Sequence, residues 1–137
     1  MLGIVFVLDR DTLEILREEK KSKGAITDVL LTSDGARIAF CTSEGSVILC
    51  EYKSLQTLMT INLHYKRPSV RCDFSSDNEF LRILFAPDRI TYFSCGEGKE
   101  YRDPNQLLHL KWNSTNSIYT WNTQGEKLVY FCFSLLY

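Results

Sequence analysis

Residues 45–51, Gly45-Ser46-Val47-Ile48-Leu49-Cys50-Glu51, closely match a stretch that lies 42 residues earlier, Gly3-Ile4-Val5-Phe6-Val7-Leu8-Asp9. A second pair of similar stretches, Ser33-Asp34-Gly35 and Ser76-Asp77-Asn78, is separated by 43 residues. Two similarities with nearly the same spacing indicate an internal repeat. A repeat of this length that consists of short strands is typical of one blade of a β-propeller.

The complete repeat divides into four short apolar segments with turn residues between them, which predicts a four-stranded antiparallel sheet. The expected strands are 25–31, 37–41, 46–52 and 55–62. Asp34-Gly35 between the first two strands strongly favours a hairpin, and Glu44-Gly45 before the third favours another. The following repeat predicts strands at 70–75, 80–85 and 90–95, and the nearly continuous apolar character of 80–85 indicates burial on both faces.

The predicted fold class is therefore all-β: a partial β-propeller with about two complete four-stranded antiparallel blades and a half blade at each end. We expect 1–23 to hold the third and fourth strands of a preceding blade with a linker, 24–62 and 63–103 to be blades, 104–126 to begin a further divergent blade, and 127–137 to be an apolar tail without an assigned element. Closed propellers use about four to eight blades, so the sequence predicts that these blades cannot close a ring by themselves.

Composition narrows the function classes. The net charge of −1 argues against a general nucleic-acid binder, which needs a basic excess to neutralise phosphates. The apolar runs at both ends are short of the roughly 20 residues that a membrane helix needs, so no membrane partner is expected. Five cysteines without a Cys-x-x-Cys pair favour a reduced, cytoplasmic compartment and offer no spacing typical of zinc ligands.

The sequence predicts no catalytic, cofactor or metal site. Only His64 and His109 could serve a catalytic cysteine, and four of the five cysteines fall in apolar strands, where a thiol is inert. Asp28 and Asp73 fall in the first strands of the two blades, which line the channel of a propeller. Such a carboxylate can hold a cation, but in repeat proteins it more often accepts a hydrogen bond from a turn of the neighbouring blade.

A cationic rim is the candidate binding surface. In a four-stranded antiparallel blade, the loop that leads into the first strand and the turn between the second and third strands lie at the same end. Six cationic residues are expected at that end: Lys20, Lys21, Lys23, Lys66, Arg67 and Arg89. A basic rim on a nearly neutral protein attracts an acidic partner and accelerates the encounter. The simpler interpretation, that these residues only keep surface loops soluble, stays open.

The blade pattern resembles WD40 repeats: a Thr27-Asp28-Val29 start, then Ser33-Asp34-Gly35, then a strand that begins Gly45-Ser46-Val47. The Trp-Asp pair that closes the third strand of a WD40 blade is replaced here by Leu8-Asp9 and Cys50-Glu51.

Divergent blades of this kind are similar to those of the echinoderm microtubule-associated protein-like (EMAP-like) family. The matching stretches are 3–8, 13–16, 25–29, 73–77 and, as the most specific part, the Trp-centred segments 110–115 and 119–125. The similarity ends after Gly125, where the family continues with Ile-Trp and this chain has Glu126-Lys127. The family's coiled coil, basic microtubule-binding region and propeller-bridging motif have no counterpart in these residues.

The resemblance implies a non-catalytic, cytoplasmic scaffold of the cytoskeleton that binds other proteins, with tubulin or microtubules as the partner. Two alternatives stay open. One is a WD40 adaptor in another complex, such as a ubiquitin-ligase substrate receptor or a ciliary transport complex, and the other is a propeller enzyme with a metal in the channel. Open blade edges expose strand hydrogen bonds and apolar faces, so the remainder of a propeller or a second copy is a further expected partner.

Overall fold

The structure is a computed structural model that describes residues 3–63, 69–85, 89–107, 109–112, 119–121 and 128–130. These residues form twelve strands and one short 3₁₀ helix, η1 (Pro104–Leu107). The strands are β1 (Gly3–Leu8), β2 (Ile15–Ser22), β3 (Ile26–Leu31), β4 (Arg37–Thr42), β5 (Ser46–Glu51), β6 (Thr57–Asn62), β7 (Ser69–Phe74), β8 (Phe80–Phe85), β9 (Arg89–Ser94), β10 (Glu100–Tyr101), β11 (Tyr119–Trp121) and β12 (Leu128–Tyr130).

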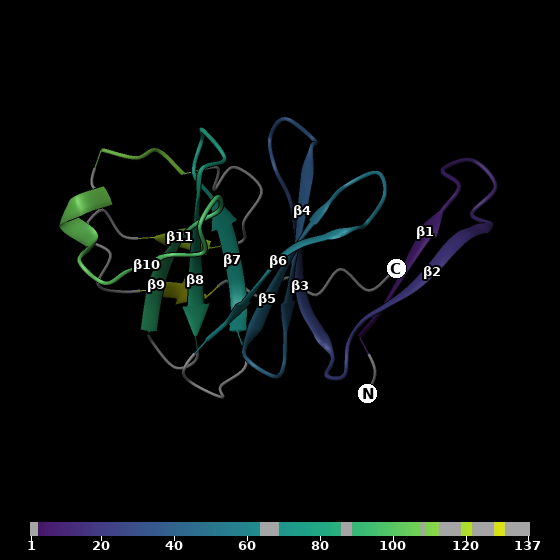
Figure 1. Cartoon of the computed structure of the whole chain (residues 1–137), viewed down its shortest axis with the longest axis horizontal. Coiled ribbons are helices and arrows are strands. Elements are labelled where there is room, and N and C mark those ends of the chain that lie inside the picture. The colour runs from purple at the N-terminus through teal and green to yellow at the C-terminus, as the bar shows by residue number, and fades with distance from the viewer. Residues whose placement is uncertain are drawn as a thin grey trace.

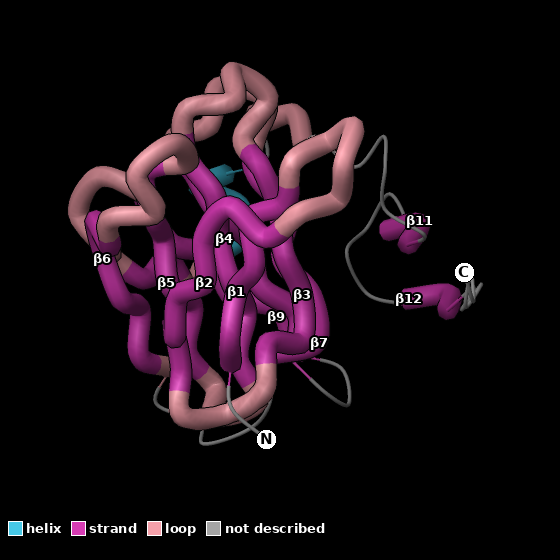
Figure 2. The backbone as a smooth tube through the Cα atoms, turned by 90° about the vertical axis from the view of Figure 1, so that its right-hand side faces the viewer, coloured by secondary structure: helices cyan, strands magenta, loops and turns pink. Residues whose placement is uncertain are grey.

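The strands form separate antiparallel sheets in which each strand pairs with its neighbours along the chain. We call β1–β2 the half blade, β3–β6 the first complete blade and β7–β10 the second complete blade. The three sheets stand side by side in chain order (Figure 1), and β7 packs against β3 and β4 where the two complete blades meet. The strands run between two ends of the molecule that carry the loops (Figure 2). The predicted four-stranded antiparallel sheets are therefore present.

The repeat extends to backbone conformation at the turn between the last two strands of a blade. In the half blade the N–H of Asp9 donates to the carbonyl of Glu14 at 2.9 Å, and in the first complete blade the N–H of Glu51 donates to the carbonyl of Gln56 at the same distance. Leu13 and Leu55, which are 42 residues apart, both have a left-handed backbone, with φ of 60° and 56°. A left-handed leucine is uncommon, so its recurrence at equivalent positions supports a true structural repeat.

The turn between the first two strands repeats as well. Gly35 and Asn78, 43 residues apart, have φ of 69° and 61°, and glycine and asparagine are the residues that most readily adopt this conformation. In each turn a hydroxyl group, on Thr32 or Ser75, donates to the aspartate two residues later. The similarity of Ser33-Asp34-Gly35 to Ser76-Asp77-Asn78 thus reflects one turn geometry that is used twice.

The core lies between the blades, and the first complete blade is buried on both faces. In β5, Val47 and Leu49 face the second complete blade, while Ile48 and Cys50 face the half blade. Leu81 and Ile83 of β8 join the same inter-blade cluster as Val47 and Leu49. Arg82, on the opposite face of β8, is also buried. This arrangement explains the continuous apolar pattern of the middle strands.

Two elements differ from the sequence expectation. β2 continues to Ser22 and so includes most of the residues expected as the linker at the end of 1–23, because residues 17–20 and 22 pair with β1. Near the C-terminal end, β12 pairs with β11 in an antiparallel sheet of two strands, although no element was expected in 127–137. Trp112, which precedes β11 in the chain, forms an isolated antiparallel β-bridge with Ser75 of the second complete blade.

Candidate protein-interaction surface

The loop between β2 and β3 and the turn between β4 and β5 meet at one end of the first complete blade. The N–H of Ser43 donates to the carbonyl of Ala25 at 2.8 Å, and the hydroxyl of Ser22 contacts Glu44 Oε2 at 3.4 Å. The approach is close at Gly24, where a Cβ would lie 2.6 Å from Ser43 Oγ, so a larger residue would require the Ser43 side chain to move. These contacts place both connections at the same end, as the blade geometry predicts.

The three lysines expected in that loop have different environments. Lys23 lies in the loop and is exposed, whereas Lys20 is exposed but belongs to β2, where it pairs with Ile4. Lys21 is also in β2, and its largely buried ammonium group lies 2.6 Å from Glu19 Oε2. The expectation that all three lysines project from a loop is therefore wrong, because β2 extends past them.

Of the other candidates, Lys66 and Arg67 lie outside the described residues. Arg89 is the first residue of β9 and its backbone pairs with Phe85, but its side chain lies outside the described part. Their role in a basic rim therefore stays a prediction.

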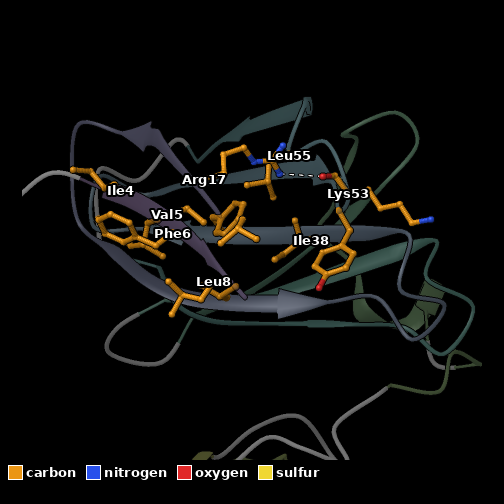
Figure 3. Close-up of a pocket in the computed structure, with 13 residues that line it drawn as sticks. Ile4, Val5, Phe6, Leu8, Arg17, Ile38, Lys53 and Leu55 are labelled. Carbon is orange, nitrogen blue, oxygen red and sulfur yellow. Dashed lines mark hydrogen bonds between the residues drawn. The ribbon is translucent and has the colours of Figure 1, made fainter. Parts of the chain in front are cut away.

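Two cations of β2 join the half blade to the next blade. No motif in the sequence indicates this role. The guanidinium group of Arg17 donates to the carbonyl of Ser54 at 3.0 Å and to that of Lys53 at 3.0 Å. Figure 3 shows the bond to Lys53. The ammonium group of Lys21 donates to the carbonyl of Leu55. Because carbonyls of one turn accept all three bonds, Arg17 and Lys21 hold the β5–β6 turn against β2.

Equivalent turns of the two complete blades also contact each other. Asn78 Oδ1 accepts hydrogen bonds from the N–H and the hydroxyl of Ser33, both at 3.1 Å. Arg37 Nη2 donates to the carbonyl of Asn78 at 2.8 Å. The β3–β4 and β7–β8 turns are thus fixed by each other as well as by their own hairpins, at the end of the blades opposite to the β2–β3 loop.

The half blade exposes an apolar face that its structural equivalents bury. Phe6 is 49% exposed and Leu13 is 69% exposed, whereas their equivalents Ile48 and Leu55 are 6% and 2% exposed. The half blade covers Ile48 and Leu55, with Val5 packed against them. Phe6 and Leu13 therefore occupy positions that a repeated blade buries against its predecessor.

An apolar groove of about 640 Å³ runs between β1 and the first complete blade (Figure 3). Residues 4–8 form one wall, and Ile26, Val29 and Ile38 belong to the other. At the junction of the two complete blades, β7 packs against β3 and β4. In the first complete blade β4 pairs with β5, the equivalent of β1, but among the described strands none pairs with the corresponding edge of β1.

The two aspartates of the inner strands have separate roles. Asp28 Oδ2 accepts the N–H of Cys72, in strand β7 of the neighbouring blade, at 3.2 Å. Asp73 lies 2.6 Å from Arg82 Nη2 within its own blade, and both side chains are buried. Burial raises the pKa of Asp73, and the guanidinium group of Arg82 partly offsets this rise. The two positions are also not equivalent in the repeat. Asp73 is opposite Arg82, which corresponds to the pair Leu30 and Ala39 in the first complete blade, whereas Asp28 is opposite Cys41.

Trp112 packs on the second complete blade. Its ring lies 4.7 Å from the guanidinium carbon of Arg82 and 5.7 Å from the ring of Tyr92. Trp112 therefore anchors its segment on this blade by packing, while the side chain of Trp121 lies outside the described residues.

Burial determines the thiol chemistry of Cys50 and Cys95. It raises the pKa of Cys50 and raises that of Cys95 to about 11. Both thiols are therefore protonated at neutral pH and are weak nucleophiles.

No helix in the described part of the chain has the length and apolarity to cross a membrane.

No family model matches the chain.

Comparison with curated proteins finds the echinoderm microtubule-associated protein-like protein elp-1 of Caenorhabditis elegans, which is 24% identical over 115 residues. The match covers 82% of this chain but 13% of elp-1, so the chain spans a small part of that relative's length. The resemblance to the EMAP-like family that the sequence motifs indicate is thereby confirmed.

Comparison with solved structures finds WD40-type propellers. The β-propeller domain of Cps50 (Swd1) from Myceliophteria thermophila matches with a TM-score of 0.67 and 18% identity, over 73% of this chain and 34% of that one. The WD40 repeats of RRP9 match with a TM-score of 0.56 and 17% identity, over 60% of this chain and 26% of that one. The predicted fold class, a partial WD40-like β-propeller, is confirmed.

Proposed function

We propose that this chain, a segment of a WD40-type β-propeller similar to the EMAP-like proteins, is a non-catalytic scaffold whose partner is tubulin or the microtubule. It is cytoplasmic and associated with the cytoskeleton in this proposal. The similarity to a protein named for microtubule association supports the partner. WD40 propellers present loops to other proteins from rigid blades, and the hydrogen bonds of Arg17, Arg37 and Asn78 between neighbouring blades support such a rigid arrangement here.

The proposed contact is the end of the blades where the β2–β3 loop meets the β4–β5 turn. Lys20 and Lys23 supply exposed positive charge there, with Lys66, Arg67 and Arg89 added from the sequence. An acidic surface such as that of tubulin is attracted to this charge. Lys21 is removed from the proposed contact set, because Glu19 and the carbonyl of Leu55 occupy its ammonium group.

Co-sedimentation with polymerised microtubules tests the proposal. The variant Lys20→Glu/Lys23→Glu reverses two exposed charges, and each is worth about 0.7 kcal/mol of binding at a surface, so we expect affinity to fall roughly tenfold. The matched control is Arg10→Glu, an exposed cation in the β1–β2 turn at the opposite end of the half blade. It should bind like the wild type, and added salt should weaken wild-type binding by screening.

Equal pelleting of wild type and Lys20→Glu/Lys23→Glu would refute the assignment to this end of the blades. A folded chain that does not pellet even at low salt would refute the microtubule as the partner. Circular dichroism of each variant separates lost binding from lost structure.

We also propose that further propeller blades, from the remainder of a propeller or a second copy, cover the half blade. The exposed Phe6 and Leu13 and the adjoining groove support this, because their equivalents at the next junction are buried. Sedimentation velocity should find concentration-dependent self-association of the isolated chain that Phe6→Ser/Leu8→Ser reduces. A wild type that stays monomeric at its solubility limit would contradict a second copy as the cover.

A further inference from the structure

Three potential metal ligands converge at the junction of the two complete blades. Antiparallel pairing of β3 with β4 places Asp28 opposite Cys41. Strand β7, which packs against both, contributes Cys72. A carboxylate oxygen of Asp28 and the two Sγ atoms all lie within 4.8 Å of one another. Among the histidine, cysteine, aspartate and glutamate side chains of the described residues, these three come close enough together to share one ion.

The backbone holds these groups in place. Asp28 Oδ2 accepts the N–H of Cys72 at 3.2 Å, and Asp28 Oδ1 accepts the N–H of Val29 at 3.1 Å. The carboxylate is therefore oriented by bonds from both blades, as the outer hydrogen bonds of a metal site orient its ligands. Cys41 and Cys72 are 0% and 5% exposed, so packing also restricts their side chains.

We propose that Asp28, Cys41 and Cys72 bind a thiophilic divalent ion, with Zn²⁺ as the ion that the donor set favours. Two thiolates and a carboxylate suit the borderline-soft zinc ion better than magnesium or calcium, which take oxygen ligands. Tetrahedral zinc with Zn–S distances of about 2.3 Å places its sulfurs roughly 3.8 Å apart. The cluster thus needs to contract by about 1 Å at most to meet this geometry, and a water molecule would take the fourth position.

Metal binding at this cluster requires the cysteines as thiolates. A divalent ion that binds there displaces the thiol protons and compensates the negative charge of the thiolates and the carboxylate.

The site joins the blades. Asp28 and Cys41 come from the first complete blade and Cys72 from the second, so bound metal would link two sheets that otherwise meet through packing and turn contacts. A ligand that binds only the folded chain raises its melting temperature. This inference is independent of tubulin binding, since the cluster is buried between the sheets and the proposed contact lies in the loops.

Equilibrium dialysis of the metal-stripped full chain against Zn²⁺ under reducing conditions, with metal analysis, tests the proposal. We expect one Zn²⁺ per wild-type chain and at least tenfold weaker binding in Cys72→Ser. Cys95→Ser is the matched control, because Cys95 is equally buried, lies in the same inter-blade cluster and is outside the ligand group. It should bind Zn²⁺ as the wild type does.

Two further measurements identify the ligands. Substitution with Co²⁺ should produce thiolate-to-metal charge-transfer absorption and the visible bands of a tetrahedral site in wild type, both weakened in Cys72→Ser. Zn²⁺ should raise the melting temperature of wild type and Cys95→Ser but not of Cys72→Ser. If Cys72→Ser fails to fold by circular dichroism, Asp28→Asn provides the test, because Asp28 is only half-buried and asparagine has the same shape. Absence of stoichiometric Zn²⁺ in wild type, equal binding by Cys72→Ser and Cys95→Ser, or unchanged binding by a folded Asp28→Asn would overturn the proposal.

Discussion

Leu13 and Leu55 provide an internal comparison of the same side chain with and without a covering blade. They occupy equivalent turns and share a left-handed backbone, with φ of 60° and 56°. Leu13 is 69% exposed and Leu55 is 2% exposed. We therefore predict that Leu55→Ala destabilises the chain much more than Leu13→Ala.

The magnitude follows from the burial of each side chain. Replacing a buried leucine by alanine costs about 2–5 kcal/mol, and we expect about 3 kcal/mol for Leu55, because it borders the groove and part of its surroundings is already open. The largely exposed Leu13 should cost about 0.5 kcal/mol or less. The left-handed strain cancels from this comparison, because alanine carries a Cβ like leucine. Glycine does not, so Leu13→Gly should stabilise the turn by up to about 1 kcal/mol.

Urea unfolding followed by circular dichroism measures these differences. With a slope of roughly 1.5 kcal/mol/M for a chain of this size, Leu55→Ala should lower the midpoint by about 2 M and Leu13→Ala by about 0.3 M or less. Equal midpoints for the two alanine variants would refute the packing of the half blade over Leu55, and with it the inference that the exposed face around Leu13 is an uncovered blade junction.

Three further predictions concern the turns and the thiols. Asn78→Ala should cost about 2–3 kcal/mol, since it removes two hydrogen bonds to Ser33 and places a Cβ-bearing residue without a polar side chain at φ 61°. Gly35→Ala, which adds a Cβ at φ 69° with no atom within 4 Å, should cost only about 1 kcal/mol in the same urea assay; equal losses would argue against the turn-to-turn contact. The hydroxyl of Ser75 lowers the pKa of Asp77 below its ordinary value of 3.8, so the folded state binds a proton at Asp77 less readily than the unfolded state. The resulting stabilisation is present above pH 3.8 and disappears as the pH falls through the lowered pKa. Asp77→Asn should therefore lose less stability than wild type between about pH 5 and pH 3, and parallel pH profiles would show that the carboxylate has no such role. Finally, because burial raises the pKa of Cys95 to about 11, iodoacetamide at pH 8 should leave Cys95 unmodified in the native chain and modify it in urea, as mass spectrometry can determine; rapid alkylation without urea would contradict its burial.

Local patterns were sufficient to predict most strands. The predicted strand 46–52 corresponds to β5 (Ser46–Glu51), and 80–85 corresponds to β8 (Phe80–Phe85). Strand ends were less predictable where the turn signal was weak. The charged residues after Arg17 were expected in the linker, but Glu18, Glu19 and Lys20 pair with β1 and so belong to β2. The charged groups of Arg17 and Lys21 donate hydrogen bonds at the blade junction.

The candidate site was predictable only in part. Because successive strands of a blade run in opposite directions, the sequence was enough to place the β2–β3 loop and the β4–β5 turn at one end. The hydrogen bond from Ser43 to Ala25 confirms this. The role of Lys21 was not predictable, because its partners depend on which carbonyls of the next blade face β2. The sequence likewise offered no zinc motif, since Asp28, Cys41 and Cys72 come from three different strands.

The sequence by itself determined the blade repeat, since strand periodicity and turn chemistry are local properties: Gly35 and Asn78 readily adopt the left-handed backbone of the turn between the first two strands of each complete blade. Tertiary structure alone decided which equivalent residues are buried and which are exposed. Leu13 and Leu55 have the same local conformation, but one faces solvent and the other faces the half blade. The physical reason is that apolar burial and hydrogen bonding between blades depend on distances across sheets, and these distances are fixed only when the blades pack together.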